Sequence, residues 1–183
     1  MQANKIELEI LKEMVALIVY SFPPVINSDS RLLLLGSMPG VVSLQAGQYY
    51  GYPRNHFWPI LYKLLGDRAP DEDYDSRLSF ALKHGIALWD SIAACVRDGS
   101  LDVDIKDAVP NDIPALLASY PSVIAVGCNG AKSFSEFNKN FGKDAQVKQR
   151  DVFRLPSTSP IPTQKFRGFE DRLEAWRVIL EYV

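Results

Sequence analysis

Four consecutive leucines, Leu32 to Leu35, constrain the fold of this chain more than any other feature of its sequence. A strand covered by helices on both faces needs no polar alternation, so an unbroken apolar run before a turn predicts a central parallel strand. The turn follows at once as Gly36-Ser37-Met38-Pro39-Gly40. Ligands bind at the carboxyl ends of strands in open α/β sheets, so we expect this turn to border a site.

Three further short apolar runs are expected to be strands of the same sheet. They cover residues 86–89, 123–126 and 152–155, and helices are expected over 56–65, 76–84, 112–120, 131–141 and 165–182. Ser76 and Asn111 are the expected caps of the second and third of these helices. Strands that alternate with helices predict an α/β fold, here a three-layer α/β/α domain with a central four-stranded parallel sheet.

The chain is long enough for one domain, and we expect a single domain over residues 1–183. Residues 5–20 have a helix-forming composition and stop before Pro23-Pro24, so segment 1–21 is expected to be an added N-terminal helix. Residues 91–112 contain Gly99, Pro110 and alternating acidic residues. That segment is expected to be irregular and to border the site.

Composition excludes several classes of site. Two cysteines and two histidines are too few for a convincing zinc cluster or a four-cysteine iron–sulfur centre, so no metal site is expected. Free buried thiols suit a reducing cytoplasm. The apolar run Val15–Val19 is too short to span a membrane, and no cleavage pattern of a signal peptide follows it. We therefore expect a cytoplasmic protein without a membrane partner.

The charge of the chain is unevenly distributed along its length. The formal net charge is −2. Residues 67–112 hold eleven acidic and five basic side chains, whereas residues 129–183 hold ten basic and seven acidic ones. This asymmetry permits one basic face that could follow a phosphate backbone, although it is equally compatible with ordinary solvated surfaces.

Polar residues follow all four expected strands. Gly36 to Gly40, Asp90, Asn129 and Ser157 to Ser159 each come at a strand's carboxyl end. The carboxyl ends of parallel strands share one edge of the sheet, so the sequence predicts that these residues meet at one rim.

The same residues carry a family resemblance. Six segments of the chain resemble the motifs of the uracil-DNA glycosylase superfamily, most closely its hypoxanthine-DNA glycosylase branch. They are Gly36 to Gly40, Gly47-Gln48-Tyr49-Tyr50, Pro53-Arg54-Asn55-His56-Phe57-Trp58, Leu88-Trp89-Asp90, Asn129-Gly130 and Leu155-Pro156-Ser157-Thr158-Ser159-Pro160. The resemblance extends over roughly residues 22–180. It implies a monofunctional DNA repair enzyme that hydrolyses the N-glycosidic bond of a deaminated base in DNA, and the hypoxanthine-DNA glycosylase branch implies that this base is hypoxanthine. It also implies a monomer that needs no cofactor.

Two other interpretations stay open. One is a member of this fold that binds nucleic acid but has lost catalysis, because Met38 stands where mismatch-specific relatives carry the asparagine that positions water. The other is an α/β enzyme that acts on free nucleotides or nucleosides. The basic carboxyl-terminal segment favours polymeric DNA.

The resemblance places two residues in catalysis. Asn55 precedes His56-Phe57-Trp58, where the hypoxanthine branch has its catalytic asparagine, and its alternative role is to cap the helix that begins at His56. Asp90 falls at a base-reading position, where an ionised carboxylate can accept the N1–H of hypoxanthine, and where a carboxyl group whose pKa is raised by burial can instead donate a proton to the leaving purine. Its alternative role is to cap a helix that would begin at Ser91. We expect His56 to be packed or to face a phosphate rather than to act as a base.

A base inside a duplex must be flipped out before it can be hydrolysed, so a pocket and a DNA-binding surface are both expected. The pocket residues are expected to be Gly36, Ser37, Met38, Tyr50, Phe57 and Trp89. The DNA-binding residues are expected to be Arg54, Asn129, Arg154, Ser157, Thr158, Ser159, Ile161, Lys165 and Arg167. Ile161, between two prolines, is the expected apolar wedge, with Phe166 as second choice. Asn129-Gly130 and the Ser157–Ser159 segment can alternatively be ordinary turns.

Overall fold

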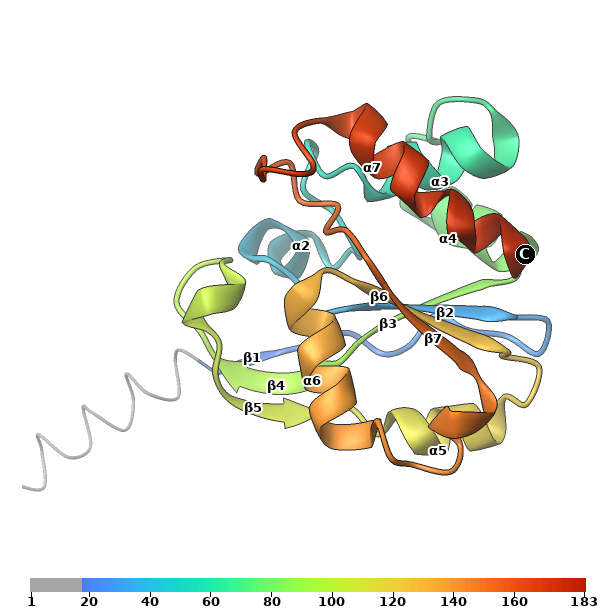
Figure 1. Cartoon of the computed structure of the whole chain (residues 1–183). Helices are drawn as coiled ribbons and strands as arrows, with labels where there is room; N and C mark the ends of the chain where they lie inside the picture. The colour runs from blue at the N-terminus through green and yellow to red at the C-terminus, as the bar shows by residue number, and fades with distance from the viewer. Residues whose placement is uncertain (1–17) are drawn as a thin grey trace, which may run out of the picture.

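A four-stranded parallel sheet forms the centre of the computed structural model, which describes residues 18–183. β3 (Ile86–Asp90), β2 (Leu32–Gly36), β6 (Ala125–Asn129) and β7 (Asp151–Leu155) lie in this order, and each neighbouring pair is parallel. Helices α3 (Phe57–Gly66), α4 (Tyr74–Lys83) and α7 (Phe169–Trp176) cover one face, and α5 (Ile113–Ser119) and α6 (Ala131–Phe141) cover the other (Figure 1). The predicted three-layer α/β/α architecture is confirmed.

The leucine run of β2 supplies both halves of the core. Leu32 and Leu34 pack into the layer of α3, α4 and α7, whereas Leu33 and Leu35 pack against α5 and α6. All four side chains are fully buried. Successive residues of a strand point to opposite faces, so a strand between two helical layers must be apolar at every position.

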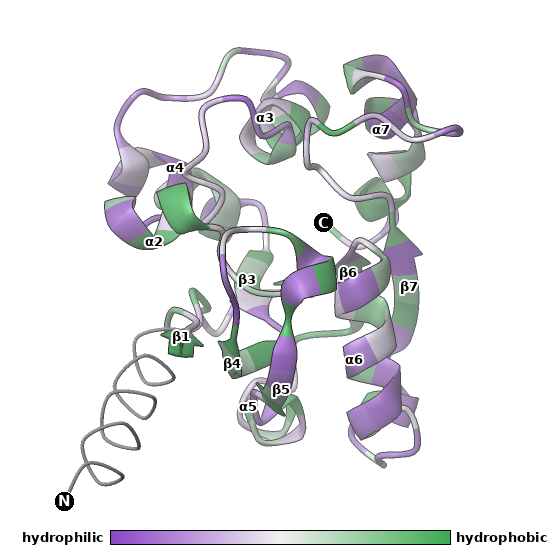
Figure 2. Ribbon diagram, turned by 90° about the vertical axis from the view of Figure 1, so that its left-hand side faces the viewer, coloured by the Kyte–Doolittle hydropathy of each residue, from purple (hydrophilic) through white to green (hydrophobic). Residues whose placement is uncertain are grey.

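A second, smaller sheet lies beside the carboxyl edge of the first. β1 (Ile18–Tyr20), β4 (Ile92–Val96) and β5 (Lys106–Pro110) pair antiparallel in the order β1-β4-β5. The prediction of an irregular segment over 91–112 is therefore wrong. The β4–β5 pairing has register shifts, and β5 carries hydrophilic residues beside the more hydrophobic β4 (Figure 2), so neither strand shows a clean alternating pattern.

The predicted N-terminal helix is wrong at its end, because Ile18–Tyr20 form β1. The rest of segment 5–20 lies outside the described residues. The predicted strand over 123–126 is displaced to Ala125–Asn129, and the last predicted helix begins only at Phe169 and continues as the 3₁₀ helix η3 (Arg177–Glu181). Nowhere in residues 18–183 does a helix have the length and apolar character needed to cross a membrane.

Two helix caps differ from the predicted ones. The carboxylate of Asp73 accepts a hydrogen bond from the Ser76 backbone N–H at 2.8 Å and caps α4, and Asp112 caps α5 in the same way. Both predictions chose a polar residue near the cap instead of the residue whose side chain reaches the N–H three positions later. Asn111 instead donates to the backbone oxygen of Asp90 at 2.8 Å and fixes the end of β3.

Candidate active site at the carboxyl edge of the sheet

The strand ends meet as the sequence predicts. Gly36 at the end of β2 pairs in register with Asp90 at the end of β3, and Asn129 at the end of β6 pairs with Leu155 at the end of β7. A short helix, α2 (Val41–Ala46), follows the Gly36–Gly40 turn. After Asp90 the chain continues through Ser91 into β4 of the small sheet. The site is thus bordered by both sheets.

Gly36, Asp90 and Tyr50 form the innermost part of this edge. A Cβ atom on Gly36 would overlap Asp90 Oδ1 and would lie 3.3 Å from the Tyr50 hydroxyl, so only glycine fits there. Asp90 Oδ2 and the Tyr50 hydroxyl are both buried, and neither finds a hydrogen-bond partner in residues 18–183. Since buried polar groups are nearly always hydrogen-bonded, two adjacent unpartnered ones indicate a place for a polar ligand.

Burial dominates the electrostatics of Asp90. It raises the pKa of this carboxyl group to about 8, the Arg97 guanidinium opposes the rise, and the Asp102 carboxylate adds to it. Asp90 therefore carries its proton at neutral pH and can donate a hydrogen bond. Burial and the nearby Asp90 also raise the pKa of Tyr50, while the Asn129 amide lowers it without meeting hydrogen-bond geometry.

The alternative interpretation of Asp90 as a helix cap is wrong, because the chain after it enters β4 rather than a helix. Ser91 donates its backbone N–H to Gly36 O at 2.8 Å. The carboxyl group is consequently free of any capping role, and its burial beside Tyr50 calls for another explanation.

Tyr50 presents one open ring face at most. Its ring stacks on Phe57 with centroids 3.7 Å apart and planes 12° from parallel. Phe57 is fully buried and meets Trp58 and Trp176 edge-on behind Tyr50. Phe57 therefore supports Tyr50, and a base could stack only on the Tyr50 face that Phe57 leaves uncovered.

Two of the expected pocket residues point elsewhere. Met38 packs with Ile92, Cys95 and Ile105 in the core of the small sheet. Trp89 packs on the side of α5 and α6 and donates its indole N–H to Phe22 O at 3.1 Å, because neighbouring residues of β3 alternate between the sheet's two faces.

Asn55 starts helix α3. Its Oδ1 accepts the backbone N–H of Phe57 at 2.9 Å, which holds the chain in the turn before the helix. This is close to the capping role weighed from the sequence, although the amide group and a second lone pair of Oδ1 remain for other partners. Asn55 is half-buried, so part of the residue is open to solvent.

His56 is packed rather than poised as a base. Its Nδ1 is buried and lacks a partner in the described part of the chain, and the ring meets Phe169 edge-on. Burial, and then the Arg172 charge, lower the pKa of His56, so the ring is neutral at pH 7. Its backbone N–H donates to Thr158 O at 2.9 Å and joins α3 to the loop after β7.

Thr158 and Asn129 are bonded to each other. Asn129 Oδ1 accepts the Thr158 N–H at 3.0 Å, and Asn129 Nδ2 donates to the Thr158 hydroxyl oxygen at 2.9 Å. Thr158 is 1% exposed. These two expected DNA-binding residues therefore use their side chains inside the protein, where they fix the loop of residues 156–162 to the end of β6.

Arg172 of α7 is a residue that the sequence analysis missed. The residue is 1% exposed, and its guanidinium donates to the backbone oxygens of Ser157, Gly168 and Ile161, each at 2.8 Å. Three carbonyl partners satisfy much of this buried charge and fix the loop's shape. One arginine in an amphipathic helix gives no sequence signal for such a role.

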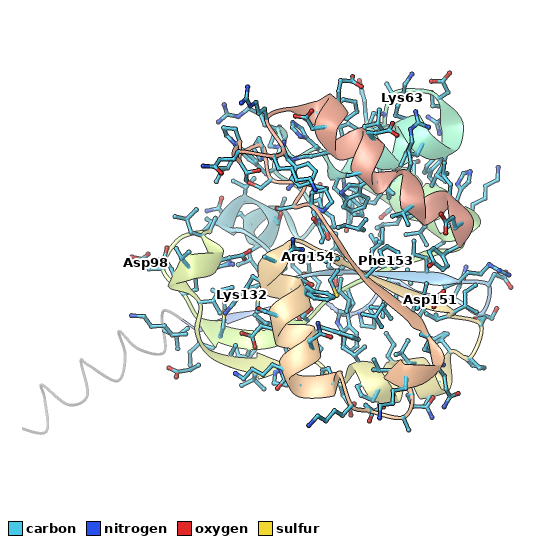
Figure 3. All side chains as sticks on the ribbon, viewed as in Figure 1. Lys63, Asp98, Lys132, Asp151, Phe153 and Arg154 are labelled. Atoms are coloured by element: carbon cyan, nitrogen blue, oxygen red, sulfur yellow. The ribbon has the colours of Figure 1, made fainter. Side chains whose placement is uncertain are left out.

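The loop still exposes the groups that DNA could contact. Ser157 is exposed, Ser159 is half-buried, and the Ile161 side chain is 57% exposed although Arg172 holds its carbonyl. The exposed cations around the rim are Arg54, Arg154, Lys165 and Arg167. Figure 3 shows Arg154 beside the upper end of α6, next to the site's edge.

Within residues 18–183 no group of three His, Cys, Asp or Glu side chains is arranged to bind a metal ion. The polar groups at the rim are a carboxyl, a phenol, amides and hydroxyls. Such groups can hold water and a heterocyclic base.

Comparisons with known proteins agree with this geometry. The family model described as the uracil DNA glycosylase superfamily matches residues 23–180. The chain is 32% identical over 157 residues to the hypoxanthine DNA glycosylase of Methanosarcina acetivorans, covering 84% of this chain and 94% of that one. It is 40% identical over 112 residues to that of Methanosarcina barkeri, covering 61% and 71%. A solution NMR structure from M. acetivorans, assigned to the uracil DNA glycosylases, superposes with a TM-score of 0.69 at 28% identity, covering 89% and 99%.

Proposed function

Since the chain belongs to the uracil DNA glycosylase superfamily, we propose that it is a monofunctional glycosylase that removes hypoxanthine from DNA. Two relatives that cover most or much of this chain are named hypoxanthine DNA glycosylases. We further propose that the single domain acts as a monomer in the cytoplasm without a cofactor.

One observation carries the proposal: two buried, unpartnered polar atoms, Asp90 Oδ2 and the Tyr50 hydroxyl, lie beside Gly36 at the sheet's carboxyl edge. Hypoxanthine offers acceptors at O6, N7 and N3 and a donor at N1. A protonated Asp90 and a phenol can both donate to such acceptors, and leaving them unpartnered without a ligand costs about 1–3 kcal/mol each. The site is thus complementary to a heterocycle rich in acceptors.

The reaction needs a leaving base and a water molecule. The C1′–N9 bond breaks with its electron pair passing to the base, which takes a proton from Asp90. Water adds through its oxygen to the cationic sugar carbon and releases a proton to solvent. In this scheme Asn55 holds the water, and Asp90 recovers its proton from solvent after the base departs.

Single-turnover excision tests the proposal. Duplexes carrying hypoxanthine, uracil, xanthine or only normal bases would be incubated with excess protein and treated with alkali, which cuts the strand at abasic sites. We expect cutting at hypoxanthine to be fastest. Binding without cutting would favour the inactive alternative, and release of hypoxanthine from deoxyinosine monophosphate at a rate equal to that from DNA would favour the free-nucleotide enzyme.

Salt dependence should locate the DNA-binding face. Each phosphate neutralised by a cation releases condensed counterions, so binding weakens as salt rises. We expect Arg154→Ala and Lys165→Ala each to reduce the slope of log affinity against log salt by about one unit. Lys63→Ala is the matched control, because Lys63 lies on α3 at the top of the view in Figure 3 and pairs with Asp67. Slopes unchanged in both rim variants would place the DNA on another face.

The exposed Ile161 side chain is the proposed wedge. A base that has left the stack leaves a gap, and an apolar side chain that fills the gap opposes its return. Ile161→Gly should slow excision from a fully paired duplex at least about tenfold more than from a single strand, where no stack has to be held open. Ile124→Gly, at another exposed apolar residue, which lies just before β6 at the opposite edge of the sheet, serves as the comparison. Equal losses on paired and unpaired substrates would return Ile161 to ordinary loop packing.

A further inference from the structure

Arg97, at the end of β4, holds the turn that follows the leucine strand. Its guanidinium donates to Pro39 O and, at 3.5 Å, to Met38 O, and the residue is 3% exposed. Its Nε is buried and has no partner within residues 18–183. Burying a guanidinium that has two carbonyl partners and an unpartnered Nε is costly, which indicates a role for this arginine beyond packing.

The loop after Arg97 makes two more contacts with the same turn. Asp102 Oδ1 accepts the Ser37 hydroxyl at 2.6 Å, and the Ser100 hydroxyl accepts the Val41 backbone N–H at 2.9 Å. Figure 1 shows this loop and α2 on the same side of the molecule, beside the sheet's carboxyl edge. Three side chains of segment 97–102 therefore hold the turn of residues 36–41 in place through hydrogen bonds.

The same loop places two opposite charges near Asp90. Arg97 favours the ionised form of the Asp90 carboxyl group, and Asp102 favours the protonated form. The other titratable groups that face Asp90 are the phenols of Tyr49, Tyr50 and Tyr74. These phenols stay neutral over the working pH range because their pKa values are raised. Arg97 and Asp102 are thus the charged groups that can tune Asp90.

We propose that Arg97 and Asp102 are positioning residues that hold the 36–41 turn and set how readily Asp90 gives its proton to the leaving base. The inference rests on the proposed function, since it assigns Asp90 the role of acid. The loop has two roles. It fixes the turn that would lie next to the sugar and base, and its opposite charges at Arg97 and Asp102 set the electrostatic potential at the Asp90 carboxyl group. An acid gives its proton fastest when its affinity for protons matches the working pH.

Opposite shifts of the pH profile test this inference. Single-turnover excision of hypoxanthine would be measured from pH 5 to pH 10 in the wild type, which should lose activity as pH rises through about 8 and Asp90 ionises. Asp102→Asn removes an anion but keeps an acceptor for Ser37, so the alkaline limb should move at least about 0.5 unit lower. Arg97→Met should move it at least about 0.5 unit higher and lower the plateau about tenfold or more.

Three further variants separate the effect of charge from the effect of holding the turn. Arg97→Lys keeps the charge but loses the planar fork, so its limb should stay in place while its plateau falls. Asp98→Asn removes a negative charge from the outer tip of the same loop (Figure 3), where Asp98 is exposed, and should change neither limb nor plateau. Asp90→Asn should abolish the limb. These comparisons do not depend on Arg97→Met being able to fold.

Limbs that stay fixed in both Asp102→Asn and Arg97→Met, or an Asp98→Asn limb that moves as far as that of Asp102→Asn, would overturn the inference. A limb that persists in Asp90→Asn would do the same. A wild type that excises no base would instead refute the proposed function. Titration of the Asp90 carboxyl carbon by NMR needs no activity, and opposite shifts there in the two variants would still support the effect of the loop's charges.

Discussion

Asn55→Ala is expected to slow hypoxanthine excision at least about a hundredfold, the scale expected for losing a positioned water molecule or a transition-state hydrogen bond. Duplex binding should survive, because the exposed cations of the rim remain. The variant also loses the Asn55 Oδ1 contact to the Phe57 N–H, which should cost about 0.5–2 kcal/mol of folding free energy. Single-turnover rates and urea unfolding, measured on the same preparations, separate the two losses.

Asn55→Asp is the matched control for this experiment. A carboxylate keeps an acceptor for the Phe57 N–H and can also accept from water, so α3 should start normally and excision should stay within about tenfold of wild type. If Asn55→Ala excises within threefold of wild type while folded, Asn55 serves only the start of the helix. Failure of both variants, with folding intact, would point to the amide Nδ2–H as the essential group.

Gly36→Ala is expected to have a comparably large effect, for a steric reason. The new methyl group would overlap Asp90 Oδ1 and approach the Tyr50 hydroxyl to 3.3 Å, so it would occupy the space beside the two unpartnered atoms. We expect excision to fall at least about a hundredfold because the acid is displaced. Overpacking a closed core should also cost about 1–3 kcal/mol of folding free energy.

Gly127→Ala separates these two consequences. Its methyl group would lie 2.9 Å from Leu34 Cδ2 and 3.2 Å from Leu155 Cδ1, inside the same sheet but among apolar atoms only. A similar loss of stability is expected, with excision by the folded fraction kept within about threefold of wild type. Equal losses of activity in the two alanine variants would mean that Gly36 matters only for packing.

The sequence by itself determined the central sheet and its functional edge. The unbroken Leu32–Leu35 run before a turn predicts a strand buried on both sides, and apolar runs that alternate with helices predict a parallel sheet. Once the strands are parallel, Gly36, Asp90 and Asn129 must fall at the same edge. These inferences hold because they depend on local patterns and on general rules of chain connection.

Only the tertiary structure decided which way side chains face at that edge. Trp89 directly precedes Asp90, yet it lies on the opposite side of the sheet, and Met38 points into the small sheet rather than into the pocket. A continuous apolar run carries no alternation, so it does not reveal which of two faces a given residue takes. The small antiparallel sheet was missed for a related reason, since its half-exposed, bulged strands lack a clear period.

The contacts that fix the geometry of the site could not be predicted from the sequence either. Arg97 reaches carbonyls 58 and 59 positions earlier, and Asn129 bonds Thr158 across 29 positions. The partners of Arg97 are backbone oxygens, which any residue type can supply, and Asn129 and Thr158 are far apart in the chain, so neither contact can be recognised from composition or spacing. The elements follow from local physical chemistry, whereas the protonation of Asp90 and the shape of its surroundings follow from charges and burial that exist only after the chain has folded.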